Sequence, residues 1–152
     1  LKADNWKNMK ESLEGFGAIE HIDSASIGYD GKILVNRTKT LIDIVGWGVI
    51  SKNYTSVDSV SKIREMLGIK EKNPSVDAAY VFIDDKIHTK AYYGQLRSDI
   101  SETHNEVTTR LSGWNGIIDL RELSDECHDV SVRLVIGNQY HKINSEYQIC
   151  IN

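Results

Sequence analysis

The sequence predicts a mainly β fold, namely an antiparallel β-sandwich of the immunoglobulin-like or jelly-roll-like type, with a short N-terminal helix and one inserted helix. Apolar and polar residues alternate in residues 130–136 and 147–151, as in strands with one buried face. Only one helical segment, residues 56–68, falls between predicted strands, which argues against repeated parallel crossovers. The 152 residues suit one domain, so we assign 1–17 to an N-terminal helix or linker and 18–152 to the sandwich.

Two helices are predicted from apolar spacing. The N-terminal helix covers residues 1–16, because Trp6, Met9 and Leu13 fall on one helical face and two glycines follow it. After this segment the pattern becomes extended. The inserted helix has an apolar face of its own. That face consists of Val57, Val60, Ile63 and Leu67.

Two tight turns are predicted between extended segments, at Asp30-Gly31 and at Asp84-Asp85-Lys86. Such hairpin turns need positive φ at both central positions, which glycine and aspartate tolerate better than most residues. Residues 41–50 are apolar on both faces, which is typical of a central strand. Trp47 lies inside this strand between two glycines, so we expect it in the core, with the glycines leaving room for its indole.

The composition argues against several function classes. The net charge is −4 and no run of lysine and arginine occurs, so we expect no nucleic-acid partner. No apolar stretch reaches the roughly 20 residues that span a bilayer. Phosphate-binding loops and zinc-ligand spacings are also missing, so we expect no cofactor and no metal. The chain starts at Leu1 without a signal peptide, and we expect it to be a piece of a longer protein.

The two cysteines, Cys127 and Cys150, leave two alternatives open. A disulfide between them can form if the domain faces an oxidising compartment. We favour two free thiols, with Cys150 half-buried in a strand, because unpaired cysteine is often buried.

Aromatic and charged residues gather in a short part of the sequence, and they provide the candidate ligand-binding residues. These are Tyr92, Tyr93, Arg97, Asp99 and Trp114. An exposed aromatic ring can stack on a pyranose while nearby charged groups bond its hydroxyls. The same residues can instead form a structural corner, in which a guanidinium satisfies loop carbonyls and a carboxylate. We favour the corner. We also expect a carboxylate, from Asp99 or a neighbouring strand, to hold Arg97 in one cluster with Trp114.

Residues 40–151 resemble the β-sandwich domain at the C-terminal end of some prokaryotic multi-spanning membrane proteins, a group of glycosyltransferases and proteins related to surface-polysaccharide synthesis. The matching motifs are Gly46-Trp47, Tyr93-Gly94 with Arg97 and Asp99, Ser112-Gly113-Trp114, and His128. The resemblance implies a non-catalytic accessory domain on the extracytoplasmic side of a cell membrane. It supplies no active site.

The leading functional hypothesis is a non-catalytic accessory or carbohydrate-binding module attached to a membrane-associated, carbohydrate-active protein. Its expected partners are a glycan and a transmembrane parent chain. Two alternatives stay open, a small secreted hydrolase that uses carboxylates near Asp99 and a purely structural interaction domain. The lack of a recognisable nucleophile–base pattern favours a module over an enzyme. The sequence leaves the oligomeric state undefined.

Overall fold

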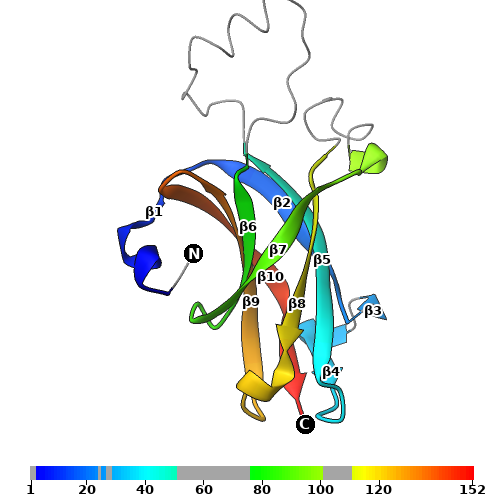
Figure 1. The fold of residues 1–152 in the computed structure, drawn as a ribbon. Coiled ribbons are helices and arrows are strands. Elements are labelled where there is room, and N and C mark those ends of the chain that lie inside the picture. The colour runs from blue at the N-terminus through cyan, green and yellow to red at the C-terminus, as the bar shows by residue number, and fades with distance from the viewer. Residues whose placement is uncertain (1–2, 24, 27–28, 51–75, 101–110) are drawn as a thin grey trace, which may run out of the picture.

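The chain folds into one curled β-sheet that forms a half-barrel (Figure 1). The computed structural model describes residues 3–23, 25–26, 29–50, 76–100 and 111–152. The strands are β1 (Lys10–Glu11), β2 (Gly15–Ile22), β3 (Ala25–Ser26), β4 (Lys32–Val35), β5 (Leu41–Ile50), β6 (Ala78–Ile83), β7 (Ile87–Gln95), β8 (Gly113–Asp119), β9 (Cys127–Ile136) and β10 (Gln139–Ile151). Short 3-10 helices are η1 (Ala3–Asn8), η2 (Tyr29–Gly31) and η4 (Leu120–Glu122). The mainly β prediction is confirmed, whereas the inserted helix expected at 56–68 lies outside the described residues.

The sheet is mixed, so the expected antiparallel sandwich is not confirmed. Its strand order is β1-β10-β9-β6-β7-β8-β5-β2-β3, and β4 also pairs with β10. Both β1 and β4 run parallel to β10, while the other described pairs are antiparallel. Sequence alternation reports which face of a strand is buried, but it does not report which strand lies beside it.

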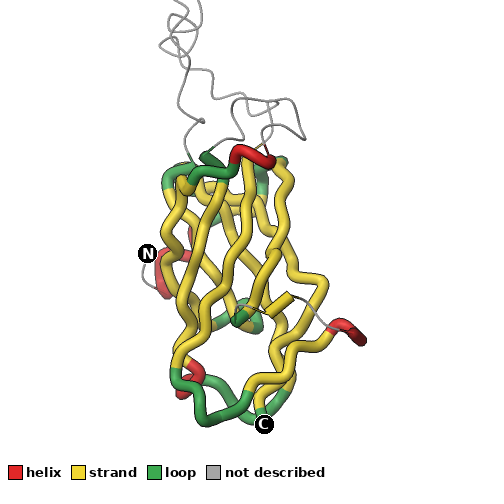
Figure 2. Tube along the Cα trace, turned by 90° about the vertical axis from the view of Figure 1, so that its right-hand side faces the viewer, coloured by secondary structure: helices red, strands yellow, loops and turns green. Residues whose placement is uncertain are grey.

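The two ends of the sheet approach each other, because β2 packs against β10. A Cβ atom added at Gly17 would lie 2.7 Å from the Ile143 side chain, and one at Gly15 would lie 2.9 Å from the His141 ring. The His141 Nδ1 atom also lies 3.1 Å from the Leu13 carbonyl oxygen. Figure 2 shows the strands curving around a common interior. One sheet therefore encloses its own hydrophobic core by curling, and no second sheet is needed to cover it.

The core consists of the inward-facing side chains of nearly every long strand. Its largest fully buried members are Ile22, Val35, Ile42, Ile44, Val81, Ile83, Trp114, Leu120, Val132, Leu134 and Ile149. Trp47 is buried as expected, with 9% of its surface exposed, but it lies outside this cluster and meets the Phe16 ring at 5.7 Å. The two glycines beside Trp47 leave room for side chains other than its indole. Gly46 faces the Trp114 indole and Gly48 faces Leu134, both too closely for a side chain to be added.

The N-terminal helix predicted over residues 1–16 is wrong beyond Asn8. Only η1 is helical, and the chain then forms β1 and enters β2 at Gly15, so β2 crosses the boundary expected at residue 17. The three apolar residues that suggested one helical face serve two separate clusters. Trp6 and Met9 pack on the outer face of the sheet, and Leu13 joins the main core. Backbone pairing of β1 with β10 outweighs the weak helical preference of so short a segment.

The two predicted turns have different outcomes. Asp84 and Asp85 have φ values of 54° and 56°, and the Lys86 amide donates to the Ile83 carbonyl at 3.1 Å, which confirms the β6–β7 hairpin. Asp30 and Gly31 also have positive φ, at 70° and 65°. The hairpin expected there is wrong, because β4 pairs with β10 in a parallel register.

A disulfide joins Cys127 to Cys150, so the preference for two free thiols is wrong. The two residues are directly opposite each other in the antiparallel β9–β10 pair. Their proximity depends on the register of two strands that are joined by a turn at residues 137–138. Sequence spacing alone does not reveal that register.

Candidate functional site

The candidate residues of the sequence cluster lie where β7 ends and β8 begins. Tyr93 is opposite Trp114, and Tyr92 is opposite Asn115. Because side chains alternate along a strand, these two rows face opposite sides of the sheet. Gly94, with φ of 104°, marks a bulge immediately after the two tyrosines. The structure therefore divides the cluster into an inner and an outer group.

The inner group is structural. Trp114 is fully buried in the main core, and Tyr93 packs against that core from a partly buried position. The Tyr93 hydroxyl donates to the Gly48 carbonyl at 2.6 Å. The Trp114 Nε1 atom is buried and has no hydrogen-bond partner among the described residues. Trp114 has no surface that a ligand in solvent could contact, whereas Tyr93 keeps a partly exposed position.

Arg97 belongs to the outer group and is held by two carboxylates. Its Nε and Nη2 atoms donate to Asp99 at 3.0 and 2.8 Å, while Nη1 and Nη2 donate to Glu20. The Arg97 stem covers Gly113, where an added Cβ would lie 3.0 Å from Arg97 Cγ. The expected carboxylate partner is confirmed. The expected cluster with Trp114 is not formed, because adjacent residues Gly113 and Trp114 face opposite sides of β8.

Glu20 is a partner that sequence patterns did not indicate. It lies in β2, 77 residues before Arg97 in the chain, and no local pattern connects the two. Hydrogen bonds to Asp99 and Glu20 raise the pKa of Arg97, and the bond from Arg97 lowers the pKa of Asp99. Arg97 lies just after the end of β7 and Glu20 lies in β2, and β8 and β5 separate these two strands in the sheet, so this ion triad joins segments that are not neighbours in the strand order. The Arg97 guanidinium thus links β2 to the segment after β7 through its two carboxylate partners.

We expect Arg97→Ala to lower the free energy of unfolding by about 1–3 kcal/mol, because two carboxylates lose a partly buried charged partner. Urea unfolding measures this loss. Arg121→Ala is the matched control, since Arg121 also pairs with an aspartate, Asp119, but is 74% exposed. Surface pairs of that kind contribute little, so the control is expected to unfold like the wild type. Equal effects of the two substitutions would contradict a structural role specific to Arg97.

The outer group also includes an exposed surface on the central strands of the sheet. We call this surface the Tyr92 face. It consists of Tyr92 on β7, Asn115 and Ile117 on β8, and Val45 on β5. Tyr92 is 69% exposed and Ile117 is 57% exposed. Asn115 lies between Tyr92 and Val45 in one cross-strand row. Alternation after Trp114 places Asn115 and Ile117 outward, and this signal could have identified both residues from the sequence.

His128, the histidine of the family-like motif, is a buried structural residue. Its Nδ1 atom lies 2.6 Å from the Asp84 carboxylate and its Nε2 atom lies 2.8 Å from the Ser124 carbonyl oxygen. Burial by itself lowers the pKa of His128, but the bonds to Asp84 and Ser124 outweigh it, and the net shift is upward. Both ring nitrogens face acceptors, which suits the protonated imidazolium. His128 therefore anchors the β6–β7 turn to β9 and does not face a ligand.

The described residues contain no group of three or more histidine, cysteine, aspartate or glutamate side chains that could hold a metal ion. Among the helices in the described part of the chain, none is long and apolar enough to cross a membrane.

Comparisons with known proteins assign no family to the chain. No family model matches it, and no curated protein matches it. Among solved structures, it is similar to the endo-beta-1,4-mannanase from Thermotoga petrophila, with a TM-score of 0.44 and 7% sequence identity. The alignment covers 91% of this chain but only 20% of the mannanase chain.

Proposed function

We propose that this protein is a non-catalytic glycan-binding module and that the Tyr92 face carries the ligand. The observation that supports this proposal is the exposed Tyr92 ring, held on the central strand β7 between two paired neighbours. Most large aromatic side chains of globular proteins are largely buried, so a ring that is 69% exposed on a rigid sheet face is available for recognition.

The chemistry of the Tyr92 face suits a sugar. A pyranose presents an apolar face that stacks on an aromatic ring and equatorial hydroxyls that need hydrogen bonds. Asn115 is directly opposite Tyr92, and its amide offers both donors and an acceptor to those hydroxyls. Directly opposed residues have Cβ atoms about 4.5–5.5 Å apart, so one ring can contact both side chains. Ile117 extends the apolar floor along β8.

The carboxylates beside this face support binding better than hydrolysis. A glycoside hydrolase needs one carboxyl group with a raised pKa as general acid. The hydrogen bond from Arg97 lowers the pKa of Asp99, and the same guanidinium holds Glu20. Asp99 thus stays ionised near neutral pH. Asp99, the carboxylate named in the hydrolase alternative, is therefore poorly suited to supply the proton.

The proposal also covers the compartment in which the module lies and the chain to which it is attached. We place the module on the extracytoplasmic side of a cell membrane, attached to a membrane-associated, carbohydrate-active parent chain. The disulfide between Cys127 and Cys150 supports an oxidising compartment, because structural disulfides are rare where thiols are kept reduced. The attachment to a parent chain rests on the sequence resemblance described above.

Affinity electrophoresis in gels containing soluble glucans, mannans, xylans or galactans tests the proposal. We expect at least one polysaccharide to retard the wild type and Tyr92→Phe, which keeps the ring. We expect Tyr92→Ala to bind roughly tenfold more weakly or not at all, because it removes the stacking surface.

Leu34→Ala is the matched control, since Leu34 is 73% exposed on β4, away from the Tyr92 face. It is expected to migrate like the wild type. Retardation of Tyr92→Ala equal to that of the wild type would reject the Tyr92 face as the site. Failure of every polysaccharide to retard the wild type would favour the structural interaction domain.

A further inference from the structure

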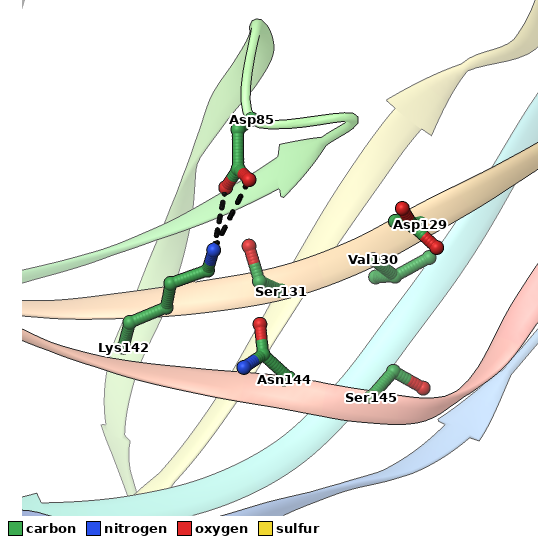
Figure 3. A pocket seen from close by; sticks show the side chains of 7 residues that line it. All are labelled: Asp85, Asp129, Val130, Ser131, Lys142, Asn144 and Ser145. Carbon is green, nitrogen blue, oxygen red and sulfur yellow. Dashed lines mark hydrogen bonds and ion pairs between the residues drawn. The ribbon is translucent and has the colours of Figure 1, made fainter.

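A second feature of the outer surface is a polar hollow on β9 and β10, shown in Figure 3. Its volume is about 260 Å³. The polar residues that line it are Asp85, Asp129, Ser131, Lys142, Asn144 and Ser145. In the strand order, β6 lies between β9 and β7, the strand that carries Tyr92, so this hollow is separate from the Tyr92 face.

A bulge in β10 accounts for the hollow. Asn144 pairs with Ser131, but the next pair is Gln148 with Asp129, so residues 145–147 face a single residue of β9. The extra residues bend β10 away from its neighbour and interrupt the ladder there. The Ser145 hydroxyl accepts a hydrogen bond from the Tyr147 amide at 3.0 Å, which stabilises the bend. The depression is therefore a built feature of the strand pair.

The charges around the hollow are balanced. Arg133 and Lys142 are directly opposite each other, and two cations in that position repel. The Asp85 carboxylate lies between them, 3.3 Å from Arg133 Nη2 and 2.9 Å from Lys142 Nζ. The hydrogen bond from Lys142 is the main cause that lowers the pKa of Asp85. Asp85, Asp129 and Lys142 line the hollow, and Arg133 lies beside it, so two carboxylates and two cations surround the site.

The floor of the hollow offers uncharged partners for hydrogen bonds. Ser131 and Asn144 are directly opposite, and Figure 3 shows their side chains pointing the same way, between Lys142 and Asp129. Only 4% of Ser131 is exposed. The carboxylates of Asp85 and Asp129 accept hydrogen bonds and the Lys142 ammonium donates them. The Asn144 amide and the Ser131 hydroxyl can do both. A ring with adjacent hydroxyls can donate to Asp85 or Asp129 while its neighbouring oxygen accepts from Lys142.

We propose that this hollow binds a neutral cyclic polyol, namely the single pyranose ring of a sugar, at a site separate from the Tyr92 face. The volume of about 260 Å³ lies just below the range of roughly 300–1,000 Å³ typical of drug-sized ligands, which suits one ring. A phosphate would meet the carboxylates of Asp85 and Asp129, and a divalent cation would meet the ammonium of Lys142. A hydroxylated ligand satisfies all of these groups without a charge penalty.

Amide chemical shifts of the isotope-labelled protein test the proposal, with the methyl pyranosides of glucose, galactose and mannose as probes. We expect at least one pyranoside to shift the amide signals of Ser131, Lys142 and Asn144. Ser131→Ala and Lys142→Met should weaken that binding roughly tenfold or more, because each removes a buried or charged hydrogen-bonding group. Lys86→Met is the matched control, an exposed lysine of the β6–β7 turn that does not line the hollow.

Three further measurements decide the ligand class and the location. Thermal unfolding of each variant confirms that it folds, and Asn144→Ala replaces any variant that does not. Tyr92→Ala should leave the pyranoside shifts unchanged, which separates this site from the Tyr92 face. Shifts caused by inorganic phosphate or calcium in place of a pyranoside would overturn the proposal. The proposal would also be overturned if no pyranoside shifted the amide signals of the hollow. It would be overturned as well if the folded variants of the hollow bound a pyranoside as strongly as the wild type does.

Discussion

Replacing Trp114 by alanine is expected to lower the free energy of unfolding by about 3–5 kcal/mol, the usual cost of truncating a large buried aromatic residue. The Trp114 side chain has no exposed surface and belongs to the main core. Its indole fills the space that Gly46 leaves open, where an added Cβ would lie 2.6 Å from the ring. The surrounding strands are paired on both sides of β8, so they can collapse into the resulting cavity only in part.

Urea unfolding monitored by circular dichroism measures this loss. Tyr92→Ala is the matched control, because Tyr92 is one residue along the adjacent strand from the partner of Trp114 but faces solvent. The control should unfold close to the wild type. A Trp114→Ala variant as stable as this control would show that the inward orientation of β8 is wrong. The register of β8 with β5 and β7 would then need revision.

Breaking the disulfide between Cys127 and Cys150 is the second large effect that we expect. The bridge joins residues 23 positions apart. Loop-closure entropy for a ring of that size corresponds to about 3 kcal/mol of stability. The bridge joins the start of β9 to the end of β10, where the Ile151 amide also donates to the Glu126 carbonyl at 3.1 Å. Its loss should let the end of β10, and β4 beside it, separate more easily.

Guanidinium unfolding with and without dithiothreitol measures this contribution. We expect dithiothreitol to destabilise the wild type and to leave the double variant Cys127→Ala, Cys150→Ala unchanged. Alanine suits both positions, since Cys150 is buried and a serine hydroxyl there would need a partner. A thiol assay that finds two reactive cysteines in the unfolded, unreduced protein would contradict the bridge.

Much of the local structure could be predicted from the sequence. Alternation in residues 130–136 correctly indicated β9, and Asp84-Asp85 correctly indicated a turn with positive φ at both positions. The expected carboxylate partner of Arg97 was confirmed in Asp99, two residues away. These features depend on side-chain period, turn conformation and near neighbours, all of which a few consecutive residues specify.

Other features depended on the tertiary structure alone. The parallel pairing of β4 with β10, the Cys127–Cys150 bridge and the contact of Arg97 with Glu20 all join distant parts of the chain. Strand pairing also divided the candidate site into an inner and an outer group. The pairing of β7 with β8 placed Trp114 inward and Tyr92 outward. The sequence by itself thus determined that the chain forms strands and where one tight hairpin turns. Which strands pair, and hence which side chains meet, was decided by the curling of one sheet around its core, because strand register depends on contacts between residues far apart in sequence.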